Sequence, residues 1–271
     1  MKHDYYNYDE KQLMDNPKIP LLIMDSADDV FKAMADEMIE IINEKAKEKK
    51  DCVLIIPVGP VGQYPYFVSR VNEEKISLKH CYFINMDEYL DENLQYISID
   101  DPLSFRGFMQ KNVYDKISDE LNVLQSRRIF PDPNNIEYIP QLIESLGGVD
   151  AVFGGIGING HLAFNEARSD LTNDEFINLK TRILEISPET RTCNCIGDLN
   201  GALQDMPTHC ITVGFNEIYN ARKIILGVFR PWHKAVIRRA AYGDSTCNFP
   251  VSLLQEKDNV LIRMPKVVAQ L

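Results

Sequence analysis

VDAVFGGIGINGHLAFNE, residues 149–166, is the stretch that decides the fold. Its first five residues, apolar except for Asp150, are typical of a buried strand. The glycines that follow permit tight turns and let the backbone come close to a ligand. Because ligands of open parallel sheets bind beyond the carboxyl ends of the strands, this stretch predicts a binding site at such a strand end.

Strand-like and helix-like segments alternate on both sides of this stretch. Apolar residues at helical spacing, such as Val30, Met34 and Met38, predict helices between apolar runs. Ser26, with Asp29 three residues later, is typical of a helix start. The alternation indicates an α/β fold, an open, mostly parallel, doubly wound (Rossmann-like) sheet with helices on both faces. Strands are expected at 19–24, 52–57, 81–85, 149–153, 210–213, 223–228 and 260–262, and helices at 26–50, 63–71, 103–117, 138–146, 215–220 and 234–242.

The chain of 271 residues is predicted to form one domain over 19–271, preceded by an N-terminal arm over 1–18. The arm is polar and rich in tyrosine, and it lacks the apolar segment of a signal peptide. We expect it to be disordered, with its tyrosines free to pack on a neighbouring subunit. The polar stretch 168–200 looks irregular and is a candidate mobile lid over the site.

Composition excludes several classes of function. With 40 acidic and 29 basic residues the net charge is −11, so neither nucleic acid nor a membrane surface is an expected partner. No window approaches the roughly 18 apolar residues of a membrane span. The six cysteines include no CxxC pair, and no histidine lies at metal-ligand spacing. We therefore predict no metal site, reduced thiols and a cytoplasmic location.

Two strand ends carry candidate chemistry. His161 is followed by Glu166, and a carboxylate can orient a histidine and raise its basicity for general acid–base work. The same spacing also fits a glycine-rich turn with a structural histidine. Asp87 and Glu88 directly follow another apolar run, where a carboxylate can abstract a proton, although helix caps and turns use aspartate in the same way. The residues alone leave these alternatives open.

Four segments, in this order, resemble the glucosamine-6-phosphate deaminase/isomerase family: FINMDEY at 83–89, GGIGINGHLAFNE at 154–166, THCITVG at 208–214 and HKA at 233–235. The similarity extends over 19–271. It implies an enzyme that opens an amino-sugar ring, moves a proton from C2 to C1 and releases ammonia, with no metal or redox cofactor. It further implies that Asp87 is the base for the C2 proton and that His161, with Glu166, assists ring opening.

The sequence departs from the family's pattern in the predicted site. Asn159 stands where the family has an aspartate, and an asparagine can hydrogen-bond but cannot carry charge. The phosphate loop, close to S/T-G-G-T-P in the family, reads VGPVG at 58–62, without hydroxyls and with a proline that has no N–H. These changes predict either an unphosphorylated substrate or an anion that is held elsewhere.

Further contacts to substrate are predicted near the lid and in the last loops. Arg191 matches a family arginine, Lys234 matches the family's phosphate lysine, and Ile196 stands where the family has another arginine. Arg230 lies in a loop that is one residue longer and is a candidate replacement charge. The predicted catalytic residues are Asp87, Asn159, His161 and Glu166, and the predicted substrate-binding residues are Gly59, Val61, Glu88, Gly155, Gly157, Arg191, Arg230 and Lys234.

The leading interpretation is an amino-sugar (phosphate) deaminase/isomerase. The alternatives are a non-catalytic protein that binds a sugar or sugar phosphate, and a phosphogluconolactonase-like hydrolase, a class in which the AFNE continuation of the histidine segment is not usual. The expected partner is a small-molecule sugar or sugar phosphate. A homo-oligomer is also expected, because oligomers are common in the family.

Overall fold

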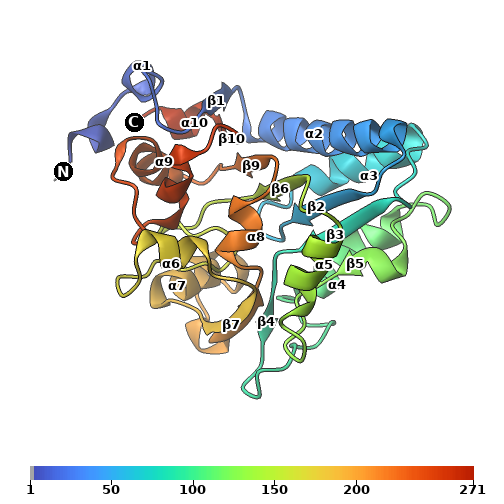
Figure 1. Ribbon diagram of the computed structural model, residues 1–271. Helices are drawn as coiled ribbons and strands as arrows, with labels where there is room; N and C mark the ends of the chain where they lie inside the picture. The colour runs from blue at the N-terminus through green and yellow to red at the C-terminus, as the bar shows by residue number, and fades with distance from the viewer. Residues whose placement is uncertain (1–2) are drawn as a thin grey trace.

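The computed structural model describes residues 3–271 and is built on a seven-stranded sheet in which every pair of neighbouring strands is parallel (Figure 1). The strand order is β1-β10-β9-β6-β2-β3-β5. The predicted fold class is therefore confirmed. The strands are β1 Leu21–Met24, β2 Cys52–Ile56, β3 Cys81–Asn85, β5 Arg128–Ile129, β6 Ala151–Gly154, β9 Ile224–Gly227 and β10 Val260–Pro265.

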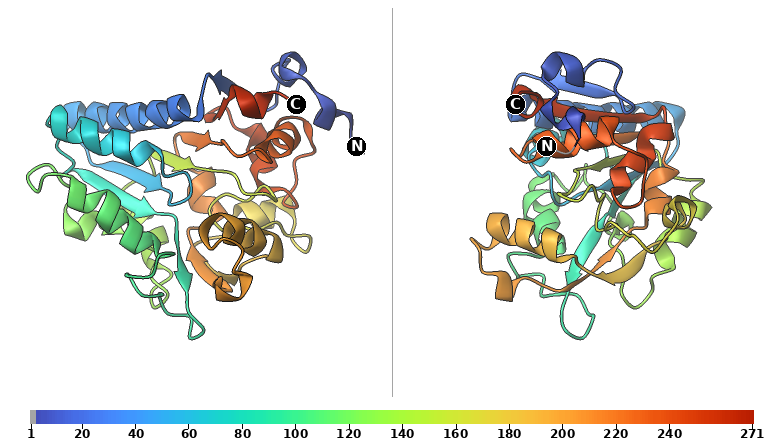
Figure 2. Two further views of the ribbon diagram at one scale, coloured as in Figure 1. Left: turned by 180° about the vertical axis from the view of Figure 1, so that it is seen from behind. Right: turned by 90° about the vertical axis from the view of Figure 1, so that its left-hand side faces the viewer.

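Helices cover both faces of this sheet because its strands alternate their side chains between two cores. In β2, Leu54 and Ile56 belong to a core shared with α2, α3 and α4, whereas Val53 and Ile55 belong to a core shared with α5, α8 and α9. Figure 2 shows α2 and α3 side by side along one face. The helices are α2 Ala27–Glu48, α3 Gln63–Glu73, α4 Phe105–Asn112, α5 Tyr138–Ser145, α8 Phe215–Tyr219 and α9 His233–Tyr242, with 3₁₀ helices η2 Tyr114–Lys116, η3 Gln125–Arg127 and η5 Pro250–Glu256.

The start of α2 follows the predicted signal. Ser26 accepts a hydrogen bond from the Asp29 amide, and the Asp29 carboxylate accepts one from the Ser26 amide, which is a capping box. Val30, Met34 and Met38 are buried on one side of the helix, as their spacing predicts.

A second, three-stranded antiparallel sheet was not predicted. It has the order β4-β8-β7, with β4 Asp87–Leu90, β7 Arg182–Glu185 and β8 His209–Thr212. The prediction that placed 210–213 in the main sheet was wrong, and 86–89 was taken only as the end of a strand. Short apolar runs show neither their direction nor the sheet that they join.

The stretch 168–200 is not irregular, so that prediction was also wrong. It holds α6 Asn173–Ile177, β7 and α7 Pro188–Asp198, with η4 Leu203–Asp205 just after it. Thr172 caps α6 and Ser187 caps α7, so both short helices begin at polar caps. The helices α6 and α7 and the strand β7 are too short and polar to show clear periodicity in the sequence.

The N-terminal arm was expected to be disordered, which is wrong for residues 3–18. It forms η1 Asp4–Asn7 and α1 Glu10–Leu13, and it lies next to α9 and to α10 Lys266–Ala269 (Figure 1). Leu13 is fully buried, and Tyr8 packs edge-on against Tyr242 of α9 in the same chain, with ring centroids 5.0 Å apart. The division into an arm and one domain stays a prediction.

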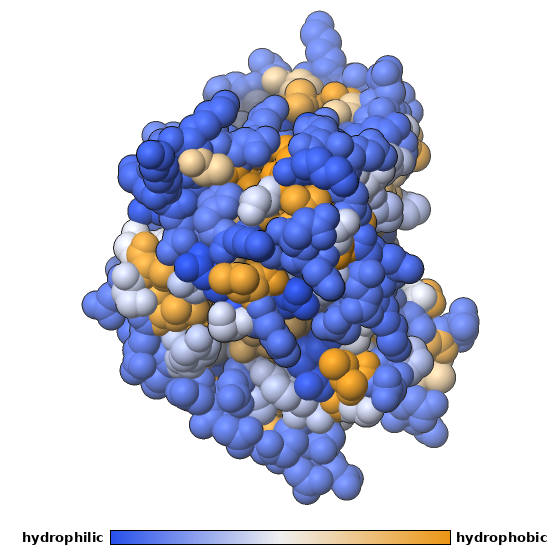
Figure 3. Space-filling model, turned by 90° about the vertical axis from the view of Figure 1, so that its right-hand side faces the viewer, coloured by the Kyte–Doolittle hydropathy of each residue, from blue (hydrophilic) through white to orange (hydrophobic). Residues whose placement is uncertain are grey.

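The surface in Figure 3 is mostly hydrophilic, with hydrophobic groups in separate small areas, in keeping with the charge of the chain. Within residues 3–271, no helix has the length and apolar character needed to cross a membrane.

Candidate active site

A cavity lies at the carboxyl ends of the central strands. It is lined by the loops that follow β2, β3, β6 and β9, and by side chains of α4 and α7. The chain runs from β2 outward through β3 to β5 and then returns to β6 on the other side of β2, so the strand order reverses between β2 and β6. Ligands of doubly wound sheets bind at such a reversal. The sequence analysis predicted a binding site at these carboxyl ends of the strands.

Asp87 faces the cavity from the first position of β4. It follows β3 by one residue and is only 6% exposed. Burial raises the pKa of the Asp87 carboxyl well above its usual range, and the neighbouring Glu88 charge raises it further. Among the described residues, none donates a hydrogen bond to this carboxylate. A buried carboxylate with a raised pKa is a stronger base, and this one is free to meet a ligand.

Glu88 was predicted to contact substrate, but it does not line the cavity. Its carboxylate accepts hydrogen bonds from the Ser104 hydroxyl, from the amides of Phe105 and Arg106, and from Arg106 Nε, at 2.9 to 3.1 Å. Adjacent residues of a strand point to opposite faces, so only one of two neighbouring acids can face the cavity. Glu88 instead holds the start of α4.

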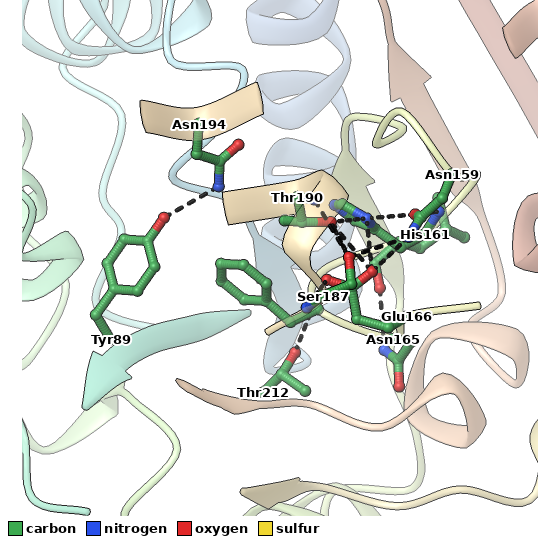
Figure 4. Close-up of polar contacts among 11 residues, drawn as sticks. Tyr89, Asn159, His161, Asn165, Glu166, Ser187, Thr190, Asn194 and Thr212 are labelled. Atoms are coloured by element: carbon green, nitrogen blue, oxygen red, sulfur yellow. Dashed lines mark hydrogen bonds and ion pairs between the residues drawn. The ribbon is translucent and has the colours of Figure 1, made fainter. Parts of the chain in front are cut away.

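His161 enters the cavity from the loop after β6, and a chain of hydrogen bonds fixes its ring (Figure 4). Asn159 Nδ2 donates to Glu166 Oε2 at 2.7 Å, and Asn159 Oδ1 lies 2.8 Å from His161 Nδ1. Because the Glu166 carboxylate only accepts, the amide oxygen of Asn159 must face the imidazole, which then donates from Nδ1. The lone pair of the neutral ring is therefore on Nε2.

Glu166 lies behind His161 and is itself surrounded by donors. Its Oε2 lies 3.4 Å from His161 Nδ1 and accepts from the Thr190 hydroxyl at 3.1 Å. Burial acts to raise the pKa of Glu166, but the hydrogen bond and charge of His161, helped by Asn159 and Thr190, outweigh it and lower the pKa to about 2. Glu166 is therefore an anion at neutral pH and stabilises positive charge on the imidazole.

Thr190 and Ser187 were not predicted and come from the stretch 168–200, at the start of α7. Ser187 caps α7 and donates its hydroxyl to Thr190 Oγ1 at 3.1 Å, while Thr190 Oγ1 lies 3.2 Å from His161 Nδ1. Thr190 is almost fully buried and lines the cavity. Nothing in the sequence signals this role, since the contact joins two segments that are 29 residues apart.

Two glycines that were predicted to bind substrate lie at the cavity, where the lack of a side chain leaves room for neighbouring groups. Gly155 and Gly157 both line the cavity. The His161 ring lies directly over Gly157, where an added Cβ would be 2.0 Å from His161 Cε1. A larger residue at position 157 would therefore displace the histidine.

The loop after β2 brings Val58, Gly59 and Pro60 to the cavity. Val61, predicted to bind substrate, does not line it and packs instead against the core under α2 and α3. An apolar side chain gains more from burial in that core than from contact with water in the cavity.

Of the three predicted basic contacts, Arg230 lines the cavity, whereas Arg191 and Lys234 do not. Arg191 is held by main-chain carbonyls, with Nε donating to Pro207 and Nη2 to Met206. No role was predicted for His233 from the sequence. It lines the cavity and is 4% exposed, with its ring bonded to the backbone on both sides.

No group of three or more histidine, cysteine or carboxylate side chains in residues 3–271 is arranged to hold a metal ion. The arrangement at hand is a buried carboxylate and an oriented imidazole that face one cavity. Such a pair can remove a proton at one atom of a ligand and transfer a proton at another.

Comparison with known proteins gives curated relatives that cover most of the chain, although no family model matches it. The glucosamine-6-phosphate deaminase of Porphyromonas gingivalis (strain ATCC BAA-308 / W83) is 31% identical over 242 residues, 87% of each chain. That of Lysinibacillus sphaericus (strain C3-41) is 28% identical over 240 residues, 86% of this chain and 94% of the relative.

Solved structures support the fold. A monomeric glucosamine-6-phosphate deaminase superposes with a TM-score of 0.79 at 24% identity, covering 93% of this chain and 99% of its own. The 6-phosphogluconolactonase of Trypanosoma brucei superposes with a TM-score of 0.66 at 15% identity, covering 93% and 98%. At these identities the likeness establishes a shared fold.

Proposed function

The chain belongs to the glucosamine-6-phosphate deaminase family, and on that premise we propose that it converts a 2-amino aldose into a ketose with release of ammonia. The single observation that carries the proposal is that Asp87 and His161 line one cavity, each from the loop after a different strand of the sheet. The relatives are named as deaminases, and the solved neighbours as a deaminase and a lactonase, so all of them are enzymes.

Ring opening is assigned to His161. Its Nε2, unprotonated in the neutral ring, accepts the proton of the C1 hydroxyl and returns a proton to the ring oxygen as the C1–O5 bond breaks. The imidazolium that forms in between is stabilised by the Glu166 anion, with Asn159 as the hydrogen-bonded link.

Proton transfer between carbons is assigned to Asp87. The carboxylate removes the proton from C2 of the open-chain aldehyde while O1 takes a proton from the C2 ammonium group, which forms an enol. The carboxylate then delivers its proton to C1, which leaves a C2 iminium. Water adds to C2, the C2–N bond breaks, and ammonia and the ketose result. The raised pKa of Asp87 suits a base that must both take and return a proton.

Asn159 and the remaining site residues complete this proposal. Asn159 has no charge, so it acts by orienting His161 and Glu166. The free thiols are consistent with a cytoplasmic setting, which stays a prediction, as does a homo-oligomer. The lactonase neighbours support only the shared fold, and a non-catalytic binding role is the alternative that the experiment below can reveal.

The test is to incubate the protein with amino sugars and to measure ammonia, ketose and exchange of the C2 proton in heavy water. Wild type should form both products, and Asp87→Asn should lose at least about 10³-fold in rate, because Asp87 is the only carboxylate among the described residues that line the cavity. Asp119→Asn, an exposed acid, is the matched control. Formation of product at the wild-type rate by Asp87→Asn, or no product with any amino sugar, would reject the proposal.

A further inference from the structure

We propose that the amino sugar carries no phosphate, and that the end of the cavity away from Asp87 and His161 accepts an uncharged group. This inference rests on the proposed function and names the substrate class of the same site. It follows from four features of the loops after β2 and β9.

The first feature is the loop after β2. Val58 and Val61 offer no hydroxyl, and Pro60 has no N–H. Both valines pack against the core beneath α2 and α3, and Val58 also presents its apolar side chain to the cavity. An anion cradle of the usual kind is built from several N–H groups and hydroxyls in sequence, and this loop lacks the hydroxyls and one of the N–H groups.

The second feature is an aromatic side chain beside the N-terminus of α3, the kind of helix end whose free amides can bind an anion. The ring of Phe31, from α2, lies against Gly62, where an added Cβ would be 2.4 Å from Phe31 Cδ2. Phe31 also packs on Phe229, with ring centroids 4.9 Å apart. This aromatic pair occupies the space beside the first turn of α3.

The third feature is His233, which uses up the amides of the loop after β9. Its Nδ1 accepts from the Phe229 amide at 3.1 Å and from the Arg230 amide at 2.8 Å. Its Nε2 donates to the Ile156 carbonyl at 3.0 Å. Burial lowers the pKa of His233 to about 4, with the Arg230 charge also acting to lower it, so the ring is neutral. Two amides that an anion could use are therefore already satisfied.

The fourth feature is charge. Arg230 is the only lysine or arginine among the described residues that line the cavity. Its Nη1 would lie 3.1 Å from a Cβ at Gly197, beside the last turn of α7, and its charge acts on Asp198 of that turn. A helix C-terminus already complements this cation. One such guanidinium is a weak match for a phosphate of charge about −1.5 to −2.

The field of the whole chain acts in the same direction. A net charge of −11 repels a phosphate ester during approach and attracts the ammonium form of an amino sugar. Phe229 and Trp232 line the cavity, and their rings supply apolar surface that suits the C–H face of a neutral sugar. An unphosphorylated 2-amino aldohexose fits these features.

The experiment compares kcat/KM for glucosamine and for glucosamine 6-phosphate on the wild-type protein. We expect glucosamine to be favoured by about tenfold or more, since one charge-assisted hydrogen bond is worth about that factor. Preference for the ester would overturn this inference and leave the proposed function standing. If neither sugar is turned over, the proposed function fails, and calorimetric titration with both sugars decides the inference. There, tighter binding of the ester, or no binding of either sugar, would overturn it.

Two variants test whether a cation nevertheless holds phosphate. Arg230→Ala and Lys234→Ala should change kcat/KM for the two sugars by the same factor, within about threefold, because neither side chain meets a phosphate. A loss that is confined to the ester in either variant would show that phosphate reaches that cation, which would overturn the inference. Thermal unfolding of each variant shows whether a loss of both activities reflects a loss of folding.

Discussion

Asn159 orients the imidazole of His161 and carries no charge of its own. Its amide nitrogen is committed to Glu166, so its oxygen faces the imidazole and selects the tautomer with a free Nε2. An aspartate at this position would place a second carboxylate 2.7 Å from Glu166, and one of the two would have to bind a proton. The amide provides the same geometry with one negative charge instead of two.

Asp87→Asn should stabilise the fold, and increasingly so as the pH rises. Because the folded-state pKa of Asp87 is raised, its contribution to stability is present below the unfolded pKa of about 4 and is lost as the pH rises through the folded value. The variant avoids this loss. A pKa raised by one corresponds to about 1.4 kcal/mol, or a Tm gain of about 3–5 °C for a chain of this size.

The measurement is the Tm of wild type and Asp87→Asn between pH 4.5 and pH 8. The difference in favour of the variant should widen with pH, while Asp119→Asn, at the exposed surface, should show none. A variant that is less stable than wild type at pH 8 would contradict the assignment of Asp87 as a buried acid with a raised pKa.

Glu166→Gln should reduce kcat by about 10²–10³-fold, because an amide keeps the hydrogen bonds but removes the anion that stabilises the imidazolium. It should also cost stability at neutral pH. The folded pKa of Glu166 is lowered to about 2, so its stabilisation is present above the unfolded pKa and is lost as the pH falls. The Tm gap between wild type and variant should therefore begin to narrow below about pH 5 and close only near pH 2. A gap that is constant with pH would argue against an ionised Glu166.

At the scale of elements, α7 completes the site from outside the main sheet. The helix begins at the Ser187 cap, and its first turn presents Thr190 to both Glu166 and His161. The orientation of the imidazole therefore depends on where this helix lies. The hydroxyl of Thr190 thus links the placement of α7 to the orientation of the His161 ring.

Thr190→Val should lower kcat by about tenfold and leave KM within about threefold, because valine keeps the shape of threonine but cannot donate to Glu166. Hydrogen exchange of the α7 amides should become faster, since the helix loses its link to the loop after β6. Thr192→Val is the matched control. Its hydroxyl bonds only the Pro188 carbonyl within α7, at the exposed surface. Equal effects of the two substitutions would show that Thr190 acts only on helix stability.

Six of the seven strands of the main sheet could be predicted from the sequence because each is a short apolar run between loops. The seventh, β5, was missed because its two residues, Arg128 and Ile129, form no such run. The antiparallel sheet could not, since a run such as 210–213 shows neither its direction nor its partner. The same limit applies to Glu88 and Val61, where only the strand pleat and the core beneath the loop decide which side chains reach the cavity. A position at the cavity could be predicted for Asp87 and His161, because each follows a strand and stands in a segment, 83–89 or 154–166, that resembles the family. The residues alone left their roles open.

At the scale of the whole molecule, the two ends of the chain meet on α9. Arg238 of α9 is fully buried and donates to main-chain carbonyls of both termini: Nε to Tyr8, and Nη2 to Ala269. Its Nη1 donates to Lys234 one turn earlier and to Val268. The sequence could not predict this contact, because a lone arginine in a helix gives no sign that carbonyls from segments about 230 and 31 residues away surround it.

Arg238→Met should therefore destabilise the whole protein more than any surface change of charge. Methionine fills much of the space but leaves several buried carbonyls without a donor, which costs about 1–3 kcal/mol for each group that stays unsatisfied. We expect a loss of at least about 3 kcal/mol, or a fall in Tm of about 6–12 °C. Arg168→Met removes an exposed arginine that pairs with Asp170 and should cost less than about 1 kcal/mol. If the arm is held only through Arg238, protease should also cut residues 3–18 of Arg238→Met before the rest of the chain unfolds. A single unfolding transition, with the arm protected until the end, would mean that the arm is held without Arg238, by the packing of Leu13 and Tyr8 and by the hydrogen bonds of the Tyr242 hydroxyl to arm carbonyls.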